Sequence, residues 1–110
     1  MSFIYDLHKR IYKNVAASST VTLDYVVPDG EILSIDVIGL NSSSSPETSS
    51  CLVWDPLGTP EILLSCYGDI IQPNLNLQFL GDGVKVLRIV LANDLTEPTY
   101  MGGYWQGVLI

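Results

Sequence analysis

Hydrophobic and polar residues alternate with a period of two along most of the chain, which is the pattern of half-buried β-strands. In residues 20–27, Val21, Leu23 and Tyr25 fall on one side of an extended chain, and Asp24 falls on the other with the threonines. The same alternation recurs later in residues 32–40 and 74–80, and residues 84–91 form a further apolar, β-prone run. The pattern predicts strands that have one face against a core and one face in water.

Tight-turn sequences separate these segments. Pro28-Asp29-Gly30 and Gly81-Asp82-Gly83 each stand between two apolar, β-prone runs, and Asp-Gly favours the turns of antiparallel hairpins. A third turn, residues 56–60, separates residues 51–55 from residues 61–67. The sequence therefore predicts three hairpins.

The chain ends in a further strand, residues 100–110, which Gly102, Gly103 and Gly107 interrupt. Glycines inside a strand indicate a bulge or a close approach of backbones. Seven or so short strands, with turns about every 8–12 residues, predict an all-β fold. We expect an antiparallel β-sandwich of jelly-roll-like form over residues 20–110.

Residues 1–19 are interpreted as an N-terminal arm. Their apolar spacing suits a short helix and an extended segment equally well, and Ala16 to Ser19 provide a small, polar hinge. Residues 41–50 contain no apolar side chain, so we expect an exposed serine-rich loop there.

Composition supports a single folded domain. Hydrophobic residues make up 47% of the 110 residues and charged residues 15%, which is too apolar for a solvated coil. The mean hydropathy of +0.31 is high for so small a domain and indicates apolar surface that a neighbouring subunit would cover.

The net charge of −7 argues against nucleic acid as a partner, because phosphate contacts require clustered cations. Lys9, Arg10 and Lys13 against Asp6 nevertheless give residues 1–13 a net charge of +2, while two cations against eleven acids give the remainder −9. A basic arm on an acidic body favours docking between subunits, although a frayed basic terminus explains the charges as well. Neither a signal peptide nor a membrane span is expected, which favours synthesis in a cytoplasm.

No catalytic constellation is visible, and we expect a protein that is not an enzyme. The single histidine, His8, falls in the arm, away from any structured nucleophile. Asp24 and Asp36, placed on the polar faces of adjacent strands, are better explained as solvated surface than as a carboxylate pair.

No metal or cofactor is expected either. Two cysteines and one remote histidine do not form a zinc site. Asp82, Asp94 and Glu97 could bind calcium only if two distant loops approach each other, and Asp82 is more simply a turn residue.

The cysteines fall in one predicted hairpin. A turn centred on Gly58 and Thr59 places Cys51 opposite Cys66, so a disulfide is conceivable. In a chain without a secretion signal, free thiols are favoured.

Aromatic residues raise a second possibility. Tyr104 and Trp105 lie beside glycines in the final strand, and Trp54 lies at a hairpin. Exposed, such rings stack on sugars or anchor protein interfaces, whereas burial in the core is the commoner explanation.

Three segments, Val26 to Ile35, Gly81 to Val90 and Gly103 to Gly107, resemble the small β-sandwich virion proteins of tailed bacteriophages, of the head-decoration or cement type. The resemblance implies a non-enzymatic structural protein on the capsid surface, made in the host cytoplasm, that forms homo-oligomers, with a trimer favoured, and clamps neighbouring major capsid protein subunits. The alternative is a carbohydrate- or receptor-binding tail module of a phage.

Interface candidates are the aromatic, apolar and basic residues of the arm and of the final strand. They are Phe3, Ile4, Tyr5, Leu7, Lys9, Arg10, Tyr12, Lys13, Tyr104, Trp105, Leu109 and Ile110.

Overall fold

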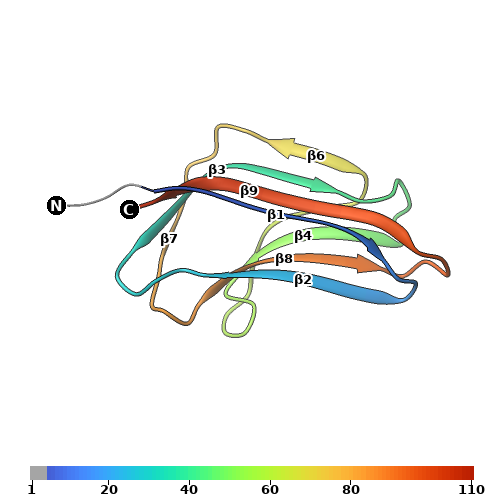
Figure 1. Ribbon diagram of the computed structural model, residues 1–110, viewed down its shortest axis with the longest axis horizontal. Coiled ribbons are helices and arrows are strands. Elements are labelled where there is room, and N and C mark those ends of the chain that lie inside the picture. The colour runs from blue at the N-terminus through green and yellow to red at the C-terminus, as the bar shows by residue number, and fades with distance from the viewer. Residues whose placement is uncertain (1–4) are drawn as a thin grey trace.

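A computed structural model describes residues 5–110 (Figure 1). The described chain forms nine strands and no helix, and so contains no helix able to cross a membrane. The strands are β1 (Tyr5–Val15), β2 (Ser19–Val26), β3 (Ile32–Asn41), β4 (Thr48–Trp54), β5 (Glu61–Cys66), β6 (Asp69–Gln72), β7 (Leu77–Leu80), β8 (Val86–Asn93) and β9 (Thr99–Leu109).

The strands form two antiparallel sheets packed face to face. The first, here the β9 sheet, has the order β1-β9-β3-β6, with β7 also paired to β3; the second, the β8 sheet, has the order β2-β8-β4-β5. Pairing is nested, because β1 joins β9, β2 joins β8, β3 joins β6, and β4 joins β5. This nesting is the jelly-roll order, and the all-β sandwich prediction is confirmed.

The core lies between the sheets and is made by alternate residues of their central strands. Leu87, Ile89 and Leu91 of β8 face Met101 and Trp105 of β9, and all five side chains are fully buried. The period-two spacing seen in the sequence thus sends one row of each strand inward and the other row outward.

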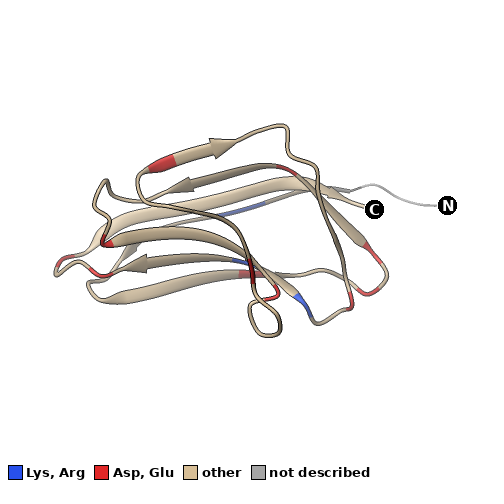
Figure 2. Cartoon of the chain, turned by 180° about the vertical axis from the view of Figure 1, so that it is seen from behind, with Lys and Arg blue, Asp and Glu red and all other residues tan. Residues whose placement is uncertain are grey.

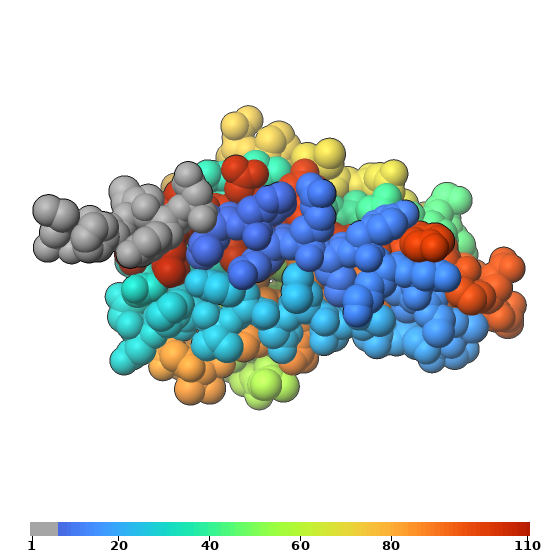
Figure 3. Space-filling model, in the orientation of Figure 1, coloured from blue at the N-terminus to red at the C-terminus, as the bar shows by residue number. Residues whose placement is uncertain are grey.

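Residues 5–15 are not an arm, and that prediction is wrong. They form β1, which pairs with β9 along its whole length from Tyr5↔Leu109 to Val15↔Thr99. Ile11 and Val15 are buried in the core. Figure 3 shows the dark-blue β1 lying along the body of the molecule. Local sequence could not reveal this, because the pairing partner is at the opposite end of the chain; Phe3 and Ile4 lie outside the described residues.

The two Asp-Gly turns are corners between sheets, so two of the three predicted hairpins are wrong. Residues 27–31 lead from β2 in one sheet to β3 in the other, and residues 81–85 lead from β7 to β8. The corners bind each other: Gly30 N–H donates to Gly81 O at 3.1 Å, and Gly81 N–H donates to Glu31 O at 2.8 Å. Gly30, at φ +78°, adopts a conformation that favours glycine.

The hairpin of β4 and β5 is confirmed, but its register differs from the prediction. A bulge after Leu52 places Cys51 opposite Ser65 and Cys66 opposite Ser50. Adjacent positions of a strand point to opposite faces, so Cys51 and Cys66 do not face each other. Both thiols are free, as favoured from the sequence. Burial, followed by the charges of Cys51 and Asp69, raises the pKa of the Cys66 thiol.

The serine-rich segment is only partly an exposed loop. β3 extends to Asn41 and β4 begins at Thr48, and the side chains of Thr48 and Ser50 are buried. Ser50 Oγ donates to Asn41 O at 2.9 Å, and Ser43 and Thr48 share a hydroxyl hydrogen bond of 3.0 Å. Hydroxyl groups can be buried here because the backbone satisfies them.

Candidate functional site

The outer face of the β9 sheet alternates large aromatic residues with glycine. Even-numbered residues of β9 point outward there. Tyr104 lies between Arg10 of β1 and Gly39 of β3, while Gly102 lies between Tyr12 of β1 and Asn41 of β3. Two neighbouring rows across the sheet therefore each contain a tyrosine and a glycine.

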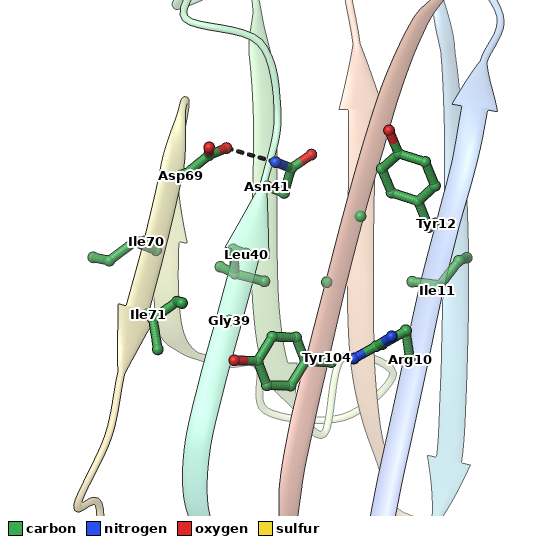
Figure 4. A pocket seen from close by; sticks show the side chains of 12 residues that line it. Arg10, Ile11, Tyr12, Gly39, Leu40, Asn41, Asp69, Ile70, Ile71 and Tyr104 are labelled. Atoms are coloured by element: carbon green, nitrogen blue, oxygen red, sulfur yellow. Dashed lines mark hydrogen bonds between the residues drawn. The ribbon is translucent and has the colours of Figure 1, made fainter.

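The glycines allow the tyrosine rings to lie along the sheet. A Cβ atom on Gly39 would overlap the ring of Tyr104, and a Cβ atom on Gly102 would lie 2.9 Å from Cδ2 of Tyr12. Figure 4 shows the Tyr104 ring extended from β9 toward β3 at Gly39. Any larger residue at Gly39 would occupy the volume that the ring now fills.

A groove of about 360 Å³ results, with glycine backbone as part of its floor (Figure 4). It crosses four strands of the β9 sheet. The side chains that surround it include Arg10, Tyr12, Asn41, Asp69, Ile71 and Tyr104. We call this groove, together with these six residues, the tyrosine groove.

Polar groups stand on both sides of the tyrosine groove. Asn41 Nδ2 donates to Asp69 Oδ1 at 2.6 Å on the β6 side. On the β1 side, the Arg10 guanidinium carbon lies 5.7 Å from the centroid of the Tyr104 ring. Among the side chains of residues 7–110, the one ion pair joins Asp24 to Arg88 on the β8 sheet, so neither Arg10 nor Asp69 takes part in an ion pair with any of these side chains.

One further ring, that of Tyr100, extends this surface. Tyr12 stacks on Tyr100 with their centroids 5.5 Å apart and their planes at 15°. Their side chains are 62% and 58% exposed. Pairs of this kind usually lie in a core or an interface, so this face offers aromatic contact area to a partner.

A second candidate surface lies at one end of the sandwich, where the chain enters β1 and leaves β9 (Figure 1). Five exposed apolar side chains belong to this end, namely Val26, Leu57, Leu80, Val84 and Ile110. We call these five residues the apolar end. Leu57 and Val84 line one hollow of about 260 Å³.

Acidic residues accompany the apolar end. Asp55 and Asp82 line the same hollow as Leu57. Asp82 accepts hydrogen bonds from the backbone N–H groups of Lys85 at 2.7 Å and Val84 at 2.9 Å, which lower the pKa of its carboxyl. Figure 2 shows the acidic residues mostly in the connections at the two ends of the sandwich.

The predicted interface residues divide between core and surface. Trp105 is 0% exposed and Leu109 is buried, because odd-numbered residues of β9 face inward. They are therefore not available to a partner. Leu7, Lys9 and Tyr104 are half-buried, whereas Arg10, Tyr12, Lys13 and Ile110 are exposed. The side chain of Tyr5 lies outside the described residues.

Lys9 and Trp54 have local roles. The Lys9 ammonium lies 5.4 Å from the centroid of the Tyr25 ring and covers the side of the sandwich between β1 and β2. Trp54 packs on Phe79 with the ring centroids 4.8 Å apart. Of the three rings considered for sugar stacking, only Tyr104 lies on the tyrosine groove.

The acidic residues considered for chemistry are separated. Asp24 and Asp36 lie on strands of different sheets, so their prediction as neighbours is wrong. Asp24 instead accepts hydrogen bonds from Nε and Nη2 of Arg88 at 2.6 and 2.8 Å. Asp82 is at the apolar end, whereas Asp94 and Glu97 are at the other end. Where side chains are described, in residues 7–110, no three His, Cys, Asp or Glu side chains form a metal-binding group.

Sequence reasoning missed Gly39, Asn41, Asp69 and Ile71. They come from β3 and β6, and the bond between Asn41 and Asp69 spans 28 positions of sequence. One signal was present, because Tyr100 and Tyr104 flank glycines in the final strand. The residues that complete the tyrosine groove could be assigned only after the strand order was known.

No family model matches this chain, and no curated protein matches it. The chain is similar to a solved structure, the NLP core of Drosophila, whose crystal structure is described as providing insight into pentamer formation and histone binding. The two chains are 13% identical over 97% of each, with a TM-score of 0.43. These values are too low to indicate a shared function.

Proposed function

We propose that this protein is a non-enzymatic structural protein of a bacteriophage virion. In this proposal it is a capsid decoration, or cement, protein, made in the host cytoplasm, which acts as a homo-oligomer, a trimer, on the capsid surface. It stabilises the shell by docking across neighbouring subunits of the major capsid protein.

The apolar end is the observation that supports this proposal most directly. Leu57 is 80% exposed and Val84 77% exposed, although both are large apolar side chains. Water-exposed apolar groups that share one end of a small domain are typical of a surface that a partner covers.

The charges around this end indicate the partner's chemistry. Asp29, Asp55 and Asp82 belong to its connections, and Lys85 is the one lysine among them. Apolar anchors within an acidic rim fit a protein surface that has an apolar centre and basic residues around it.

The opposite end suits exposure to solvent. Its loops contain the acidic residues Glu47, Asp94 and Glu97, which are all exposed. Tyr67, in the connection from β5 to β6 at this end, is 57% exposed. In this proposal the apolar end faces the capsid shell, and the acidic end opposite to it faces the solvent.

The fold is compatible with this function. Jelly rolls form capsid domains, lectins and cupins, so the architecture allows a virion role and the surfaces must select among the alternatives.

The test is binding to undecorated, expanded shells of the phage that encodes the protein. A variant with both Leu57→Ser and Val84→Ser should bind these shells about tenfold more weakly or worse, because it loses two apolar anchors. Tyr67→Ser, which removes an exposed apolar side chain at the opposite end, should bind like the original protein. If the original protein, the double variant and Tyr67→Ser all bound the shells equally well, the apolar end would be rejected as the docking surface.

Oligomeric state is tested separately by light scattering during gel filtration. A trimer has three times the 12.1 kDa mass of one chain. A stable monomer at all concentrations would overturn the homo-oligomer.

The second candidate function is a carbohydrate- or receptor-binding tail module. The tyrosine groove favours it, because the half-buried Tyr104, the exposed Tyr12 and polar side chains meet there on one face. This candidate is tested on a glycan array. If the protein binds no saccharide there, the candidate is rejected.

A further inference from the structure

We infer that the tyrosine groove binds a neutral saccharide, with a pyranose ring stacked on Tyr104. This inference deepens the second candidate function and does not rest on docking to a capsid.

The ring of Tyr104 forms a stacking platform. It extends along the sheet because Gly39 has no side chain, and Figure 4 shows it in the middle of the groove between β1 and β6. A tyrosine held in this way loses little conformational freedom when a ligand binds. The apolar C–H face of a pyranose matches the flat face of such a ring.

Hydrogen-bonding groups flank this platform on two sides. Arg10 offers guanidinium N–H donors from β1. Across the groove, the bond from Asn41 Nδ2 to Asp69 Oδ1 fixes both side chains and leaves Asp69 Oδ2 and Asn41 Oδ1 as acceptors. Sugar hydroxyls, which both donate and accept, can be satisfied on both sides.

Charge selects a neutral sugar. One cation, Arg10, and one anion, Asp69, line the tyrosine groove, so their charges cancel. An acidic saccharide or a phosphate would gain at Arg10 but would be repelled by Asp69. The net charge of −7 on the whole chain adds to this repulsion.

The dimensions fit a short segment of glycan. At about 360 Å³ the groove is at the lower end of the range of small-molecule sites, about 300–1,000 Å³. Ile71, which is 64% exposed, and Tyr12 supply apolar contact on either side of the platform. The stacked rings of Tyr12 and Tyr100 continue the surface for a second sugar unit.

The experiment begins with a glycan array of neutral and acidic saccharides, followed by calorimetry with the neutral oligosaccharide that binds best. Tyr104→Ala should weaken this binding by about tenfold or more, because it removes the platform. Gly39→Ala should have a similar effect although it changes no groove side chain, because its methyl group displaces the Tyr104 ring. Tyr67→Ala, at an exposed tyrosine outside the groove, should leave the affinity unchanged.

The fold of each variant is checked by its urea unfolding transition. Asp69→Ala gives an independent variant, because it removes an acceptor without touching the platform; it should also weaken binding of the neutral oligosaccharide.

The possible outcomes distinguish a failure of this inference from a failure of the second candidate function, on which it rests. Binding of neutral saccharides that survives Tyr104→Ala, Gly39→Ala and Asp69→Ala would keep the carbohydrate function and overturn the site. Binding of acidic saccharides alone would overturn the ligand class. Binding of no saccharide would overturn both the inference and the second candidate function, while shell docking through the apolar end would be unaffected.

Discussion

The two sheets of this jelly roll have similar inner faces and different outer faces. Both send alternate apolar residues into one core. On the outer face of the β8 sheet, however, the side chains are small or branched, for example Thr22, Val53 and Val90. The outer face of the β9 sheet has tyrosines next to glycines, for example Tyr104 beside Gly39.

The difference shows how one strand pattern produces either a closed or a receptive surface. On the β8 sheet, neighbouring side chains cover one another, so that Val53 is nearly buried although it points outward, and Asp24 is bound by Arg88. On the β9 sheet, glycine leaves volume beside each ring and a groove forms. The second face therefore offers a groove to a ligand, whereas the first leaves a single large apolar side chain of β5, Ile62, 65% exposed beside Val53.

The largest expected effect distinguishes the roles of glycine and of small side chains. A Cβ atom on Gly102 would lie 2.8 Å from the backbone oxygen of Ile11, so Gly102→Ala forces β1 and β9 apart. We expect its free energy of unfolding to fall by about 1–3 kcal/mol in urea denaturation. Thr22→Ala on the β8 face should change it by less than about 0.5 kcal/mol. If Gly102→Ala and Thr22→Ala lowered the free energy of unfolding equally, the contrast between the β9 face and the β8 face would be rejected.

A smaller effect concerns the stacked rings of the β9 face. A double-mutant cycle of Tyr12→Ala and Tyr100→Ala should give a coupling of about 0.5–1 kcal/mol in the free energy of unfolding, because the rings touch and exclude water from each other. A cycle of Tyr12→Ala with the distant Tyr67→Ala should give no coupling. If both cycles gave the same value, the stack would contribute nothing specific.

The smallest effect concerns the ion pair of the β8 face. Hydrogen bonds from Arg88 lower the pKa of the Asp24 carboxyl below its ordinary value. A lowered folded-state pKa adds stability above the unfolded-state pKa and loses it as the pH falls through the folded-state pKa. Because both side chains are partly exposed, the difference in unfolding free energy between the original protein and Asp24→Asn should stay below about 1 kcal/mol at neutral pH.

Unfolding titrations in urea at neutral pH and at about pH 2 test this sign. The advantage of the original protein over Asp24→Asn should shrink in acid. An advantage that grows as the pH falls would contradict the assigned role of Arg88.

Alternation along β2, β3 and β7 was enough to predict an all-β sandwich, because the inward and outward rows of a strand are a local property of its sequence. The connections were harder. Pro28-Asp29-Gly30 has the chemistry of a hairpin turn, yet the chain there crosses to the other sheet. A turn signal reports that the chain bends, not which strand it will meet afterwards.

The candidate site could be predicted only in part. Tyr104 was identified beside its glycines, but Trp105 was grouped with it although the strand places the two side chains on opposite faces. Knowing that Ile38 and Leu40 face the core would have assigned Gly39 to the outer face. Its contact with Tyr104 depends on the pairing of β3 with β9, which joins residues some 65 positions apart in sequence.

The place of β9 has a consequence for biosynthesis. Of the nine described strands, the last along the chain, β9, is an interior strand of its sheet, and it is the hydrogen-bonding partner of the first, β1. While the chain is still growing, β1 therefore has no strand to pair with, and β3 lacks a neighbour on one side. The growing chain must keep these apolar segments in solution until β9 has emerged, so we expect the β9 sheet to form only after β9 has been synthesised.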